Sequence, residues 1–375
     1  MIVLLLAMLP LAYGKLSCLN NNLDAVAWYA AMKVPHKFLA SYTDPTVDNE
    51  SLGVYPGHLI NTTKSSIGGT IDQVFQNKDV AFVAWNDECP SNSLVKQKKS
   101  TSNHSFRSAH YRRRRLLEES AHSKGIIAWD GSSGFWLVHS VPKFPDYNDQ
   151  SYSWSGDIRG TYAQSFLCVS LDQDNIEIAA NQVQYMDTNI CSSNMPSSLR
   201  SDVPNMVGLI YGHSNYDDVK NAQTLQAVNG QKFISFSKDG SWGKDLYEDF
   251  VEPTLKLGFY WQTWRRPAGV IESSVCDSTY KSQNVLYIEF PDDDLLWHYT
   301  KDHSKYGVSS SAGSSYVCIG GINRMESQRK RGGGTLCFEN NVLHTQILNA
   351  FKTVELCFEV FGYFVSFLTF SDSFR

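Results

Sequence analysis

Short apolar runs bounded by polar turn residues predict β-strands in the first part of this chain. Residues 24–35 (DAVAWYAAMKVP) carry Val, Trp and Tyr, which favour a strand, although the alanines would also allow a helix. Residues 79–87 (DVAFVAWND) form a near-continuous apolar run, as in a strand buried on both faces of a sheet. Residues 124–140 predict a β-hairpin, because two strand-like runs flank the turn sequence DGSSG and Pro142 ends the second run.

The middle and the end of the chain mix strand-like and helix-like patterns. Two more stretches predict strands, residues 176–185 and 315–324. Residues 243–257 predict a helix with a rough apolar face, and Pro253 is expected to break or kink it. Residues 342–356 predict a final helix, for which Asn340 or Asn341 could be the amino-terminal cap.

Length and composition describe a folded chain without a global charge signature. At 375 residues it is long enough for two domains or for one large two-lobed domain. With 42% hydrophobic and 19% charged residues it should fold rather than stay disordered. The formal net charge is −5, so no basic excess points to a nucleic-acid partner, and local patches must be judged instead. At endosomal pH the ten histidines would move this balance towards positive.

The amino terminus predicts a secretory signal peptide over residues 1–14. Its first ten residues (MIVLLLAMLP) form an apolar core that is too short for a permanent membrane-spanning helix. Ala12 and Gly14 are small residues at the −3 and −1 positions of a cleavage site, so the mature chain should start near Lys15. An uncleaved anchor is the alternative, and the short apolar run argues against it.

Cysteines and glycosylation sequons also indicate the secretory pathway. Eight cysteines after a signal peptide imply disulfides, and the lack of a C-x-x-C sequence argues against a zinc site or a redox motif. Three N-x-S/T sequons, at Asn49, Asn61 and Asn103, are candidate glycosylation sites. They all fall in the first third of the chain, which should therefore be rich in surface.

The chain contains two copies of a His-Ser-Lys triplet, His122-Ser123-Lys124 and His303-Ser304-Lys305. On a strand, residues i and i+2 point to the same face, so each triplet would present an imidazole beside an ammonium group. Two such pairs suit a phosphate group, because one histidine can attack, the other can protonate the leaving oxygen, and two lysines can hold the charge. Spacing alone is also compatible with two unrelated surface triplets. His139, at the end of the predicted hairpin, would return close to His122.

Several longer stretches occur in order along the chain, namely AHSKGIIAWD (121–130), GFWLVHSVPKFP (134–145), YAQSFLCVSL (162–171), SWGKDLYEDFVEPTLK (241–256), WQTWRR (261–266), YTKDHSKY (299–306) and CIGGINRMESQRKRGGGTLC (318–337). Together they closely resemble the deoxyribonuclease II (DNase II) family, from about Leu16 to Cys357. The resemblance implies an α/β fold of the phospholipase D-like type, in which two pseudo-symmetric halves, each a mixed β-sheet flanked by helices, share one central active site. The halves would span residues 15–195 and 196–357, followed by a divergent apolar tail at 358–375.

By this resemblance the protein is an acid endonuclease that needs no metal and no cofactor, with DNA as its substrate. It would cut phosphodiesters to 3′-phosphate and 5′-hydroxyl ends through a phosphohistidine intermediate. The resemblance implies catalytic roles for five residues: His122, Lys124, His139, His303 and Lys305. His122 would be the nucleophile and His303 the acid. Asn323 would support them from a strand beside the phosphate, and Asp130 would be the orienting acid.

Basic and aromatic segments are candidate DNA contacts, each with a plainer alternative. The basic residues Arg324, Arg329, Lys330 and Arg331, which lead into three glycines, could hold DNA phosphates or form a solvated turn. Residues 261–266 could present aromatic and arginine side chains to DNA, or form a strand packed on the core. Residues 112–115, four arginines, could be a solvated loop, a cleavage site for a basic-specific secretory protease or a further phosphate contact.

The resemblance also implies three disulfides, Cys18–Cys168, Cys276–Cys357 and Cys318–Cys337. Cys89 and Cys191 stand outside these bridges, and they either pair with each other or stay free. The tail after Cys357 departs from the family and is too short for a confident membrane span. It could be an extension, a packing strand or an error in the gene model.

The expected protein is therefore a lysosomal or secreted endonuclease without a membrane anchor, and a homodimer is possible. A catalytically inactive, secreted DNase II-like binding protein is the main alternative, and the two intact triplets argue against it. A phospholipid phosphodiesterase would share the His-x-Lys chemistry. The sequence HSVPKFP, however, resembles the DNase II family specifically.

Overall fold

The computed structural model describes residues 16–75, 77–90, 121–147, 151–154, 158–213, 218–265, 272–290, 295–355 and 357. Several predicted features lie outside these residues: the signal peptide, Asn103, the arginines at 112–115, Arg266 and the tail after Cys357. Of the two described sequon asparagines, Asn49 is exposed and Asn61 is half-buried. Within the described ranges, no helix is long and apolar enough to cross a membrane.

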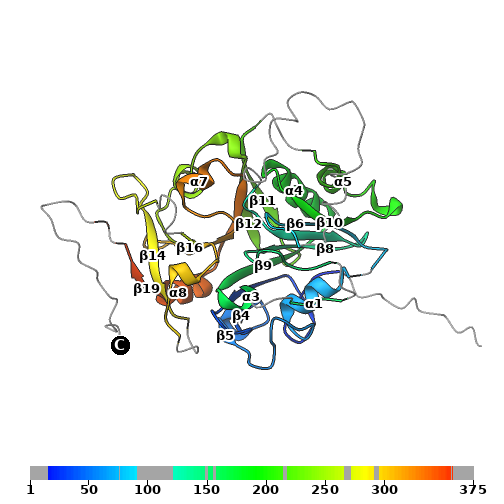
Figure 1. The fold of residues 1–375 in the computed structure, drawn as a ribbon, viewed down its shortest axis with the longest axis horizontal. Helices are drawn as coiled ribbons and strands as arrows, with labels where there is room; N and C mark the ends of the chain where they lie inside the picture. Colours follow the sequence, from blue (N-terminus) through cyan, green and yellow to red (C-terminus); the bar gives the residue numbers. More distant parts are fainter. Residues whose placement is uncertain are drawn as a thin grey trace, which may run out of the picture.

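Two large β-sheets form the body of the molecule (Figure 1). The first is antiparallel at every described strand pair, contrary to the expected mixed sheet, and the second is mixed, because it contains one parallel pair. In the first sheet the strands lie in the order β10 (Ile190–Asn194), β6 (Ala81–Trp85), β7 (Gly125–Trp129), β8 (Gly134–His139), β9 (Gln164–Leu171), β3 (Trp28–Lys33), β4 (Ala40–Thr43) and β5 (Gly53–Val54). In the second sheet the order is β11 (Lys220–Gln226), β12 (Lys232–Lys238), β18 (Gly333–Glu339), β17 (Tyr316–Gly320), β16 (Tyr306–Ser309), β13 (Phe259–Gln262), β14 (Ser282–Ile288) and β15 (Trp297–His298). β19 (Phe351–Val354) also pairs with β14, and β1 (Cys18–Leu19) pairs with β2 (Ala25–Val26).

The helices are short and mostly peripheral. The two longest are α4 (Gln173–Tyr185), which follows β9, and α8 (Asn341–Ala350), which follows β18. The other α-helices are α1 (Ser66–Asp72), α3 (Ile158–Thr161), α5 (Pro204–Tyr211), α6 (Glu252–Leu255) and α7 (Glu326–Arg329). Shorter helical turns are η1 (Asp48–Glu50), η3 (Ser197–Leu199), η4 (Gly240–Trp242), η5 (Tyr247–Val251, a π-turn) and η6 (Tyr299–Lys301).

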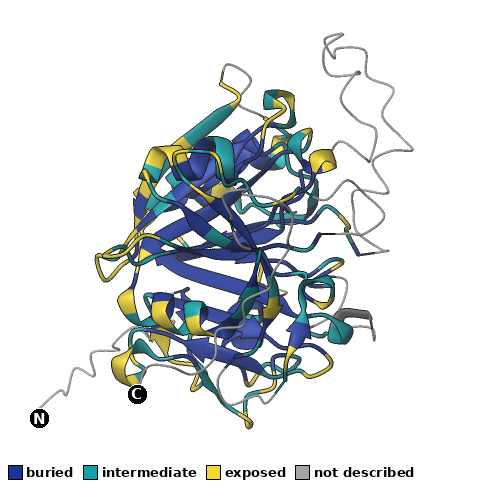
Figure 2. Cartoon of the chain, turned by 90° about the vertical axis from the view of Figure 1, so that its left-hand side faces the viewer, coloured by how far each residue is buried: buried dark blue, intermediate teal, exposed yellow. Residues whose placement is uncertain are grey.

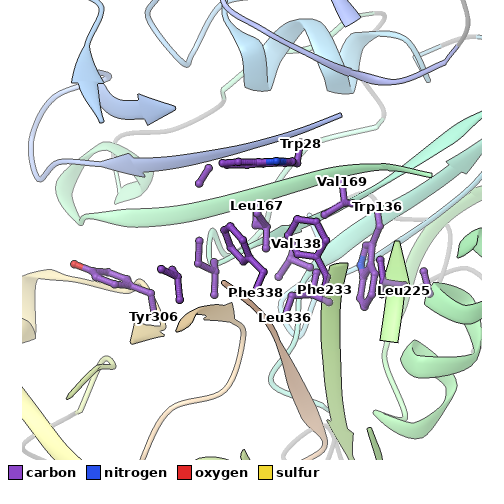
Figure 3. Packing of buried hydrophobic residues seen from close by; sticks show 14 of the residues in the cluster. Trp28, Trp136, Val138, Leu167, Val169, Leu225, Phe233, Tyr306, Leu336 and Phe338 are labelled. Atoms are coloured by element: carbon purple, nitrogen blue, oxygen red, sulfur yellow. The ribbon is translucent and has the colours of Figure 1, made fainter. Parts of the chain in front are cut away.

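Apolar side chains fill the space between the two sheets and cover both outer faces. The central layer joins Trp28, Trp136 and Leu167 of the first sheet to Phe233 and Phe338 of the second (Figure 3). Two further clusters lie under α1 and under η5. Most sheet strands are consequently dark blue in Figure 2, and the exposed residues collect in the loops, the outer helices and the edge strand β11. Burial on both faces explains why the strand sequences read as continuous apolar runs rather than as alternating ones.

Most of the predicted strands are confirmed. The structure places β3, β6, the β7–β8 hairpin and β17 inside the stretches at 24–35, 79–87, 124–140 and 315–324. The strand predicted at 176–185 is wrong, because these residues belong to the helix α4. Its buried residues include Ile176, Ala179, Ala180 and Val183, which follow the i, i+3, i+4, i+7 spacing of one helix face. Asp172 caps this helix by accepting a hydrogen bond from the Asn175 amide at 3.0 Å.

Both predicted helices exist but are shorter than expected. The helical part of residues 243–257 is limited to η5 and α6, and Pro253 lies in the first turn of α6. The final helix is capped by Asn340, whose side chain accepts from the Leu343 amide at 2.9 Å. It ends at Ala350, because the following residues pair with β14 as β19.

All eight cysteines form disulfides. The bridges are Cys18–Cys168, Cys89–Cys191, Cys276–Cys357 and Cys318–Cys337. Three of them are the pairs that the family resemblance implies. The fourth joins the two cysteines whose state the sequence left open, and it ties the residues after β6 to β10.

Candidate active site

Two hairpins place the two triplets at corresponding points of the two sheets. His122-Ser123-Lys124 directly precedes β7, and His303-Ser304-Lys305 directly precedes β16. On the return strand, the His139 amide donates to the Lys124 carbonyl at 3.3 Å, so the hairpin brings His139 beside the first triplet, as predicted. In the second sheet the matching donor to the Lys305 carbonyl is the amide of Gly320, at 2.8 Å. Asn323, which was expected on a strand, lies in the loop three residues after Gly320, the last residue of β17, and is buried.

A carboxylate that the sequence analysis did not identify connects the residues around His122. Asp87, two residues after β6, lies with Oδ2 at 3.1 Å from His122 Nδ1, and its Oδ1 forms an ion pair with Lys124 Nζ. Arg331 approaches from the second sheet's side, with Nη2 at 3.5 Å from Asp87 Oδ2. Strands β6 and β7 are antiparallel, with Trp85 opposite Gly125, and this pairing carries Asp87 to the triplet.

His122 Nδ1 has two neighbours that favour different tautomers. Asp87 can only accept a hydrogen, whereas Arg331 Nη1, at 2.9 Å, can only donate one. We assign the hydrogen to Nδ1, because an N–H pointing at a carboxylate is a charge-assisted hydrogen bond. Arg331 has other acceptors in Asp87 and in the Ala121 carbonyl at 3.4 Å. In this tautomer the lone pair of His122 is on Nε2.

Burial and charge set the protonation of this cluster. Burial lowers the pKa of His122 well below its ordinary value, and the Lys124 ammonium lowers it further against the opposing effect of Asp87. Burial and Lys124 therefore favour the neutral form of His122. The pKa of His139 is lowered to about 3, mainly by burial and then by Lys124. For Asp87, burial raises the pKa, but Lys124, His122 and Arg331 outweigh it and hold the pKa far below the ordinary range. Asp87 is consequently a carboxylate at any working pH.

Two aromatic rings contact the imidazole of His303. Its imidazole stacks on the ring of Tyr162 at a centroid distance of 4.1 Å and meets the ring of Trp264 at 4.0 Å in a tilted contact. Such aromatic contacts stabilise an imidazolium by cation–π attraction. The neighbouring acid Asp302 is turned away and accepts from the Ser304 amide at 2.8 Å and from Trp297 Nε1 at 3.0 Å.

The two triplets are close enough to affect each other electrostatically. Burial lowers the pKa of Lys305 well below its ordinary value, and repulsion from the Lys124 ammonium contributes next, against attraction from Asp87 and Asp302. Lys305 in turn lowers the pKa of His122. The chain after β17 also passes His122, since a Cβ on Gly321 would lie 3.1 Å from the His122 carbonyl oxygen. The two sheets therefore bring two imidazoles and two ammonium groups to one region.

Two candidate residues do not belong to this region. Asp130 lies in the β7–β8 turn, at the other end of β7 from His122, where it accepts hydrogen bonds from Ser132, Ser133 and the Leu16 amide. The acid beside His122 is Asp87 instead. Arg324 is completely buried and donates to Asn284 Oδ1, so it does not lie on a surface that DNA could touch.

The remaining basic candidates differ in their accessibility. Lys330 is exposed, and Arg329 is partly exposed with Nε at 2.5 Å from Glu272 Oε1. Trp261 and Arg265 are buried, so the core alternative holds for them, while Trp264 is half-buried against His303. Among the described residues, no group of three or more His, Cys, Asp or Glu side chains is arranged to hold a metal ion.

A buried histidine on a carboxylate, with lysines and a second histidine nearby, describes a site for phosphate-ester chemistry. The chain belongs to the deoxyribonuclease II family, whose sequence profile matches residues 17–357. It is 31% identical to plancitoxin-1 of Acanthaster planci over 91% of this chain and 92% of that protein. It is also 31% identical to deoxyribonuclease-2 of Caenorhabditis elegans, over 91% of this chain and 94% of that protein. With rat deoxyribonuclease-2-alpha the identity is 28%, over 95% and 98% of the two chains. The protein is therefore a DNase II-type endonuclease.

Proposed function

We propose that the protein is an acid endodeoxyribonuclease that hydrolyses DNA to 3′-phosphate and 5′-hydroxyl ends through a phosphohistidine on His122. The observation that carries this proposal is the Asp87–His122 contact of 3.1 Å within a cluster of three cationic side chains, Lys124, Lys305 and Arg331. It supplies a neutral imidazole at acidic pH beside the charges that a phosphodiester requires.

The two sheets correspond to the two phospholipase D-like halves that we propose. The adjacent strands β6, β7, β8, β9 and β3 of the first sheet match β13, β16, β17, β18 and β12 of the second. A His-Ser-Lys triplet precedes β7 and β16, and a long helix follows β9 and β18. The contacts of α5 with β6 and β10 support a boundary between the proposed halves after Tyr211, later than the expected residue 195.

In the first step, His122 Nε2 attacks phosphorus while its Nδ1–H stays on Asp87. The P–O5′ bond breaks, and His303, as an imidazolium, donates its proton to O5′. Tyr162 and Trp264 stabilise that imidazolium before transfer. In the second step, water attacks phosphorus, His303 takes its proton, and the P–N bond breaks to release the 3′-phosphate.

Lysine and arginine side chains supply the positive charge for both steps. Lys124 and Lys305 lie beside the two histidines and would hold the non-bridging oxygens. His139 and Asn323 are buried polar residues near the ends of β8 and β17, and we propose that they support the site. Outside it, the exposed Lys330 and the partly exposed Arg329 are candidate contacts for DNA phosphates.

We further propose that the enzyme works in an acidic or extracellular compartment. Four disulfides fit an oxidising secretory route, and the proposed cycle pairs one neutral with one protonated imidazole, a combination that an acidic compartment favours.

Nicking of supercoiled plasmid tests this function. The wild-type protein should nick plasmid at pH 5 in excess EDTA and leave 3′-phosphate ends, whereas His122→Ala should be inactive. Activity that disappears with EDTA and returns with magnesium would contradict the two-histidine mechanism. Full activity of His122→Ala would show that His122 is not the nucleophile.

A further inference from the structure

Two buried lysines outside the triplets occupy matching places in the two sheets. Lys33 is the last residue of β3 and lies opposite Gln164, the first residue of β9. Lys238 is the last residue of β12 and lies opposite Gly333, the first residue of β18. Both side chains are almost completely inaccessible to solvent, with 1% and 0% exposure. Neither can therefore contact DNA, and the mechanism above uses neither.

Each lysine binds the loop that enters the neighbouring strand. Lys33 Nζ donates to the carbonyls of Val34, Gly160 and Tyr162 at 2.9, 2.8 and 2.8 Å. Lys238 Nζ donates to the carbonyls of Gln328, Arg329 and Arg331 at 3.4, 2.9 and 2.6 Å. Counted back from β9 and β18, Gly160 and Tyr162 correspond to Arg329 and Arg331. Two of the three carbonyl acceptors thus occupy equivalent positions in the two sheets.

These two loops hold the histidines of the opposite sheets. In the loop before β9, the Ala163 carbonyl accepts from the His303 amide at 2.9 Å, and the Tyr162 ring stacks on the His303 ring. In the loop before β18, the Gly332 carbonyl accepts from the His122 amide at 2.8 Å, and Arg331 donates to Asp87, the carboxylate that faces His122 Nδ1. Each histidine is consequently positioned by a main-chain bond and a side chain from the other half.

We propose that Lys33 and Lys238 are paired positioning residues, each fixing in its own half the loop that orients the catalytic histidine of the other half. The inference rests on the proposed catalytic roles of His122 and His303. Three carbonyls around one Nζ match the three N–H donors of a charged ammonium group, which a neutral amine could not supply.

The charges around the two lysines keep them protonated in acid. Burial lowers the pKa of Lys33 to about 7 against the attraction of Asp302, and the Phe38 ring lies 5.9 Å from Nζ. Burial lowers the pKa of Lys238 to about 8 against attraction from the carboxylates of Asp245, Asp239, Asp249 and Glu272. Both lysines therefore bind their loops fully at pH 5.

Methionine substitutions separate this role from a general effect on folding. Lys33→Met and Lys238→Met keep the length of the side chain and remove its donors. Each should lower kcat by roughly 10–10²-fold, the scale of a misplaced catalytic group, with little change in KM. Lys232→Met, at the exposed start of β12, is the matched control and should leave kcat unchanged.

The decisive readout is the titration of individual histidines by NMR, with carbon-13-labelled histidine and assignments from His122→Ala and His303→Ala. Lys33→Met should shift the titration of His303 by about half a pKa unit or more and leave His122 unchanged, and Lys238→Met should do the reverse. Shifts in both histidines, in neither, or in the histidine of the same half would overturn the proposal.

If a methionine variant fails to fold, the cross-half positioning can be tested with variants that leave the buried lysines in place. Tyr162→Leu, at a half-buried position, should affect His303 alone, and Arg331→Met should affect His122 alone. Failure of these patterns would reject the cross-half positioning. Activity retained in His122→Ala or His303→Ala would instead reject the catalytic roles of these histidines. The NMR titration does not depend on those roles, so the two failures are distinguishable.

Discussion

At the scale of single residues, the role of His122 depends on a neighbour that is remote in the sequence. Asp87 selects the Nδ1–H tautomer, and the same carboxylate pairs with Lys124, so one side chain orients both members of the first triplet. The described ring contacts of His303 are with Tyr162 and Trp264, and its neighbour Asp302 faces Ser304 and Trp297.

Asp87→Asn tests this assignment. The amide nitrogen can donate to His122 Nδ1, which moves the hydrogen to Nε2 and blocks the attacking lone pair, so kcat at pH 5 should fall by roughly 10²–10⁴-fold. Asp130→Asn is the control. It should lower the melting temperature slightly, because it weakens the turn contacts to Ser132, Ser133 and Leu16, and leave plasmid nicking intact. Equal activity of the two variants would show that Asp87 does not set the tautomer.

The histidines and lysines of the site could be predicted from the sequence, but the acid could not. The triplets are local patterns, and His139 follows from the hairpin that returns to His122. Asp87 lies 35 positions before His122, and only the pairing of β6 with β7 brings it near. A polar residue just after a buried strand was the available indication. Arg324 shows the opposite error, because a basic residue beside a basic run turned out to be buried.

At the scale of elements, close approach of the main chain fixes the loop before β18. A Cβ on Gly332 would lie 1.9 Å from the Met186 carbonyl oxygen, so only glycine fits between α4 and this loop. The same residue accepts the His122 amide through its carbonyl. Packing between the end of α4 and this loop is therefore transmitted directly to the proposed nucleophile.

Gly332→Ala should consequently damage both stability and activity. Displacing the loop or Met186 should cost about 1–3 kcal/mol of folding free energy, as overpacking does, and kcat should fall with it. Gly57→Ala is the comparison, because a Cβ there meets no atom within 4 Å. Thermal melting and plasmid nicking of both variants measure the effect. A Gly332→Ala enzyme with wild-type kcat would mean that the loop can move without moving His122.

Elements were predicted well where burial on both faces left a continuous apolar run, and poorly where local patterns were ambiguous. The β-branched residues of α4 resembled a strand, although the spacing from Ile176 to Val183 fits a helix. The final helix was predicted to run too far towards the carboxyl terminus. Phe351–Val354 pair with β14 instead of continuing the helix, and no local sequence pattern indicates this contact.

At the scale of the whole molecule, the site should behave as one unit built from two halves. His122→Ala and His303→Ala should each lose several orders of magnitude in kcat, and the double variant should be little worse than the poorer single one, because members of one catalytic unit are not additive. Single-turnover nicking of the three variants at pH 5 measures this. Near wild-type cleavage by His303→Ala would mean that the second triplet does not take part.

The stability of the molecule should also depend on pH through a buried carboxyl group. Burial raises the pKa of Glu252 to about 7 from 4.5, and its Oε1 accepts from Trp261 Nε1 at 2.8 Å. The folded state thus favours the protonated form, and this contribution to stability is complete below the unfolded pKa and is lost as the pH rises towards 7. The loss amounts to roughly 3 kcal/mol at about 1.4 kcal/mol per pKa unit.

Glu252→Gln isolates this effect, because the amide keeps the oxygen that Trp261 needs and does not ionise. Between pH 5 and pH 7 the melting temperature of the wild type should fall by a few degrees more than that of the variant. Parallel changes in the two proteins would show that Glu252 is not responsible. Lys238, with a pKa of about 8, contributes little over this interval.

The disulfides have a consequence for how long the enzyme survives among proteases. Cys18–Cys168 and Cys89–Cys191 lie within the first half, and Cys276–Cys357 and Cys318–Cys337 lie within the second. With the halves divided between α5 and β11 as we propose, none of the four disulfides joins one half to the other. One cut there would leave two internally cross-linked fragments held together by non-covalent contacts, namely the apolar layer between the sheets and hydrogen bonds such as those of the His122 and His303 amides. Their association would then depend on concentration, and dilution would separate each histidine from the loop that orients it.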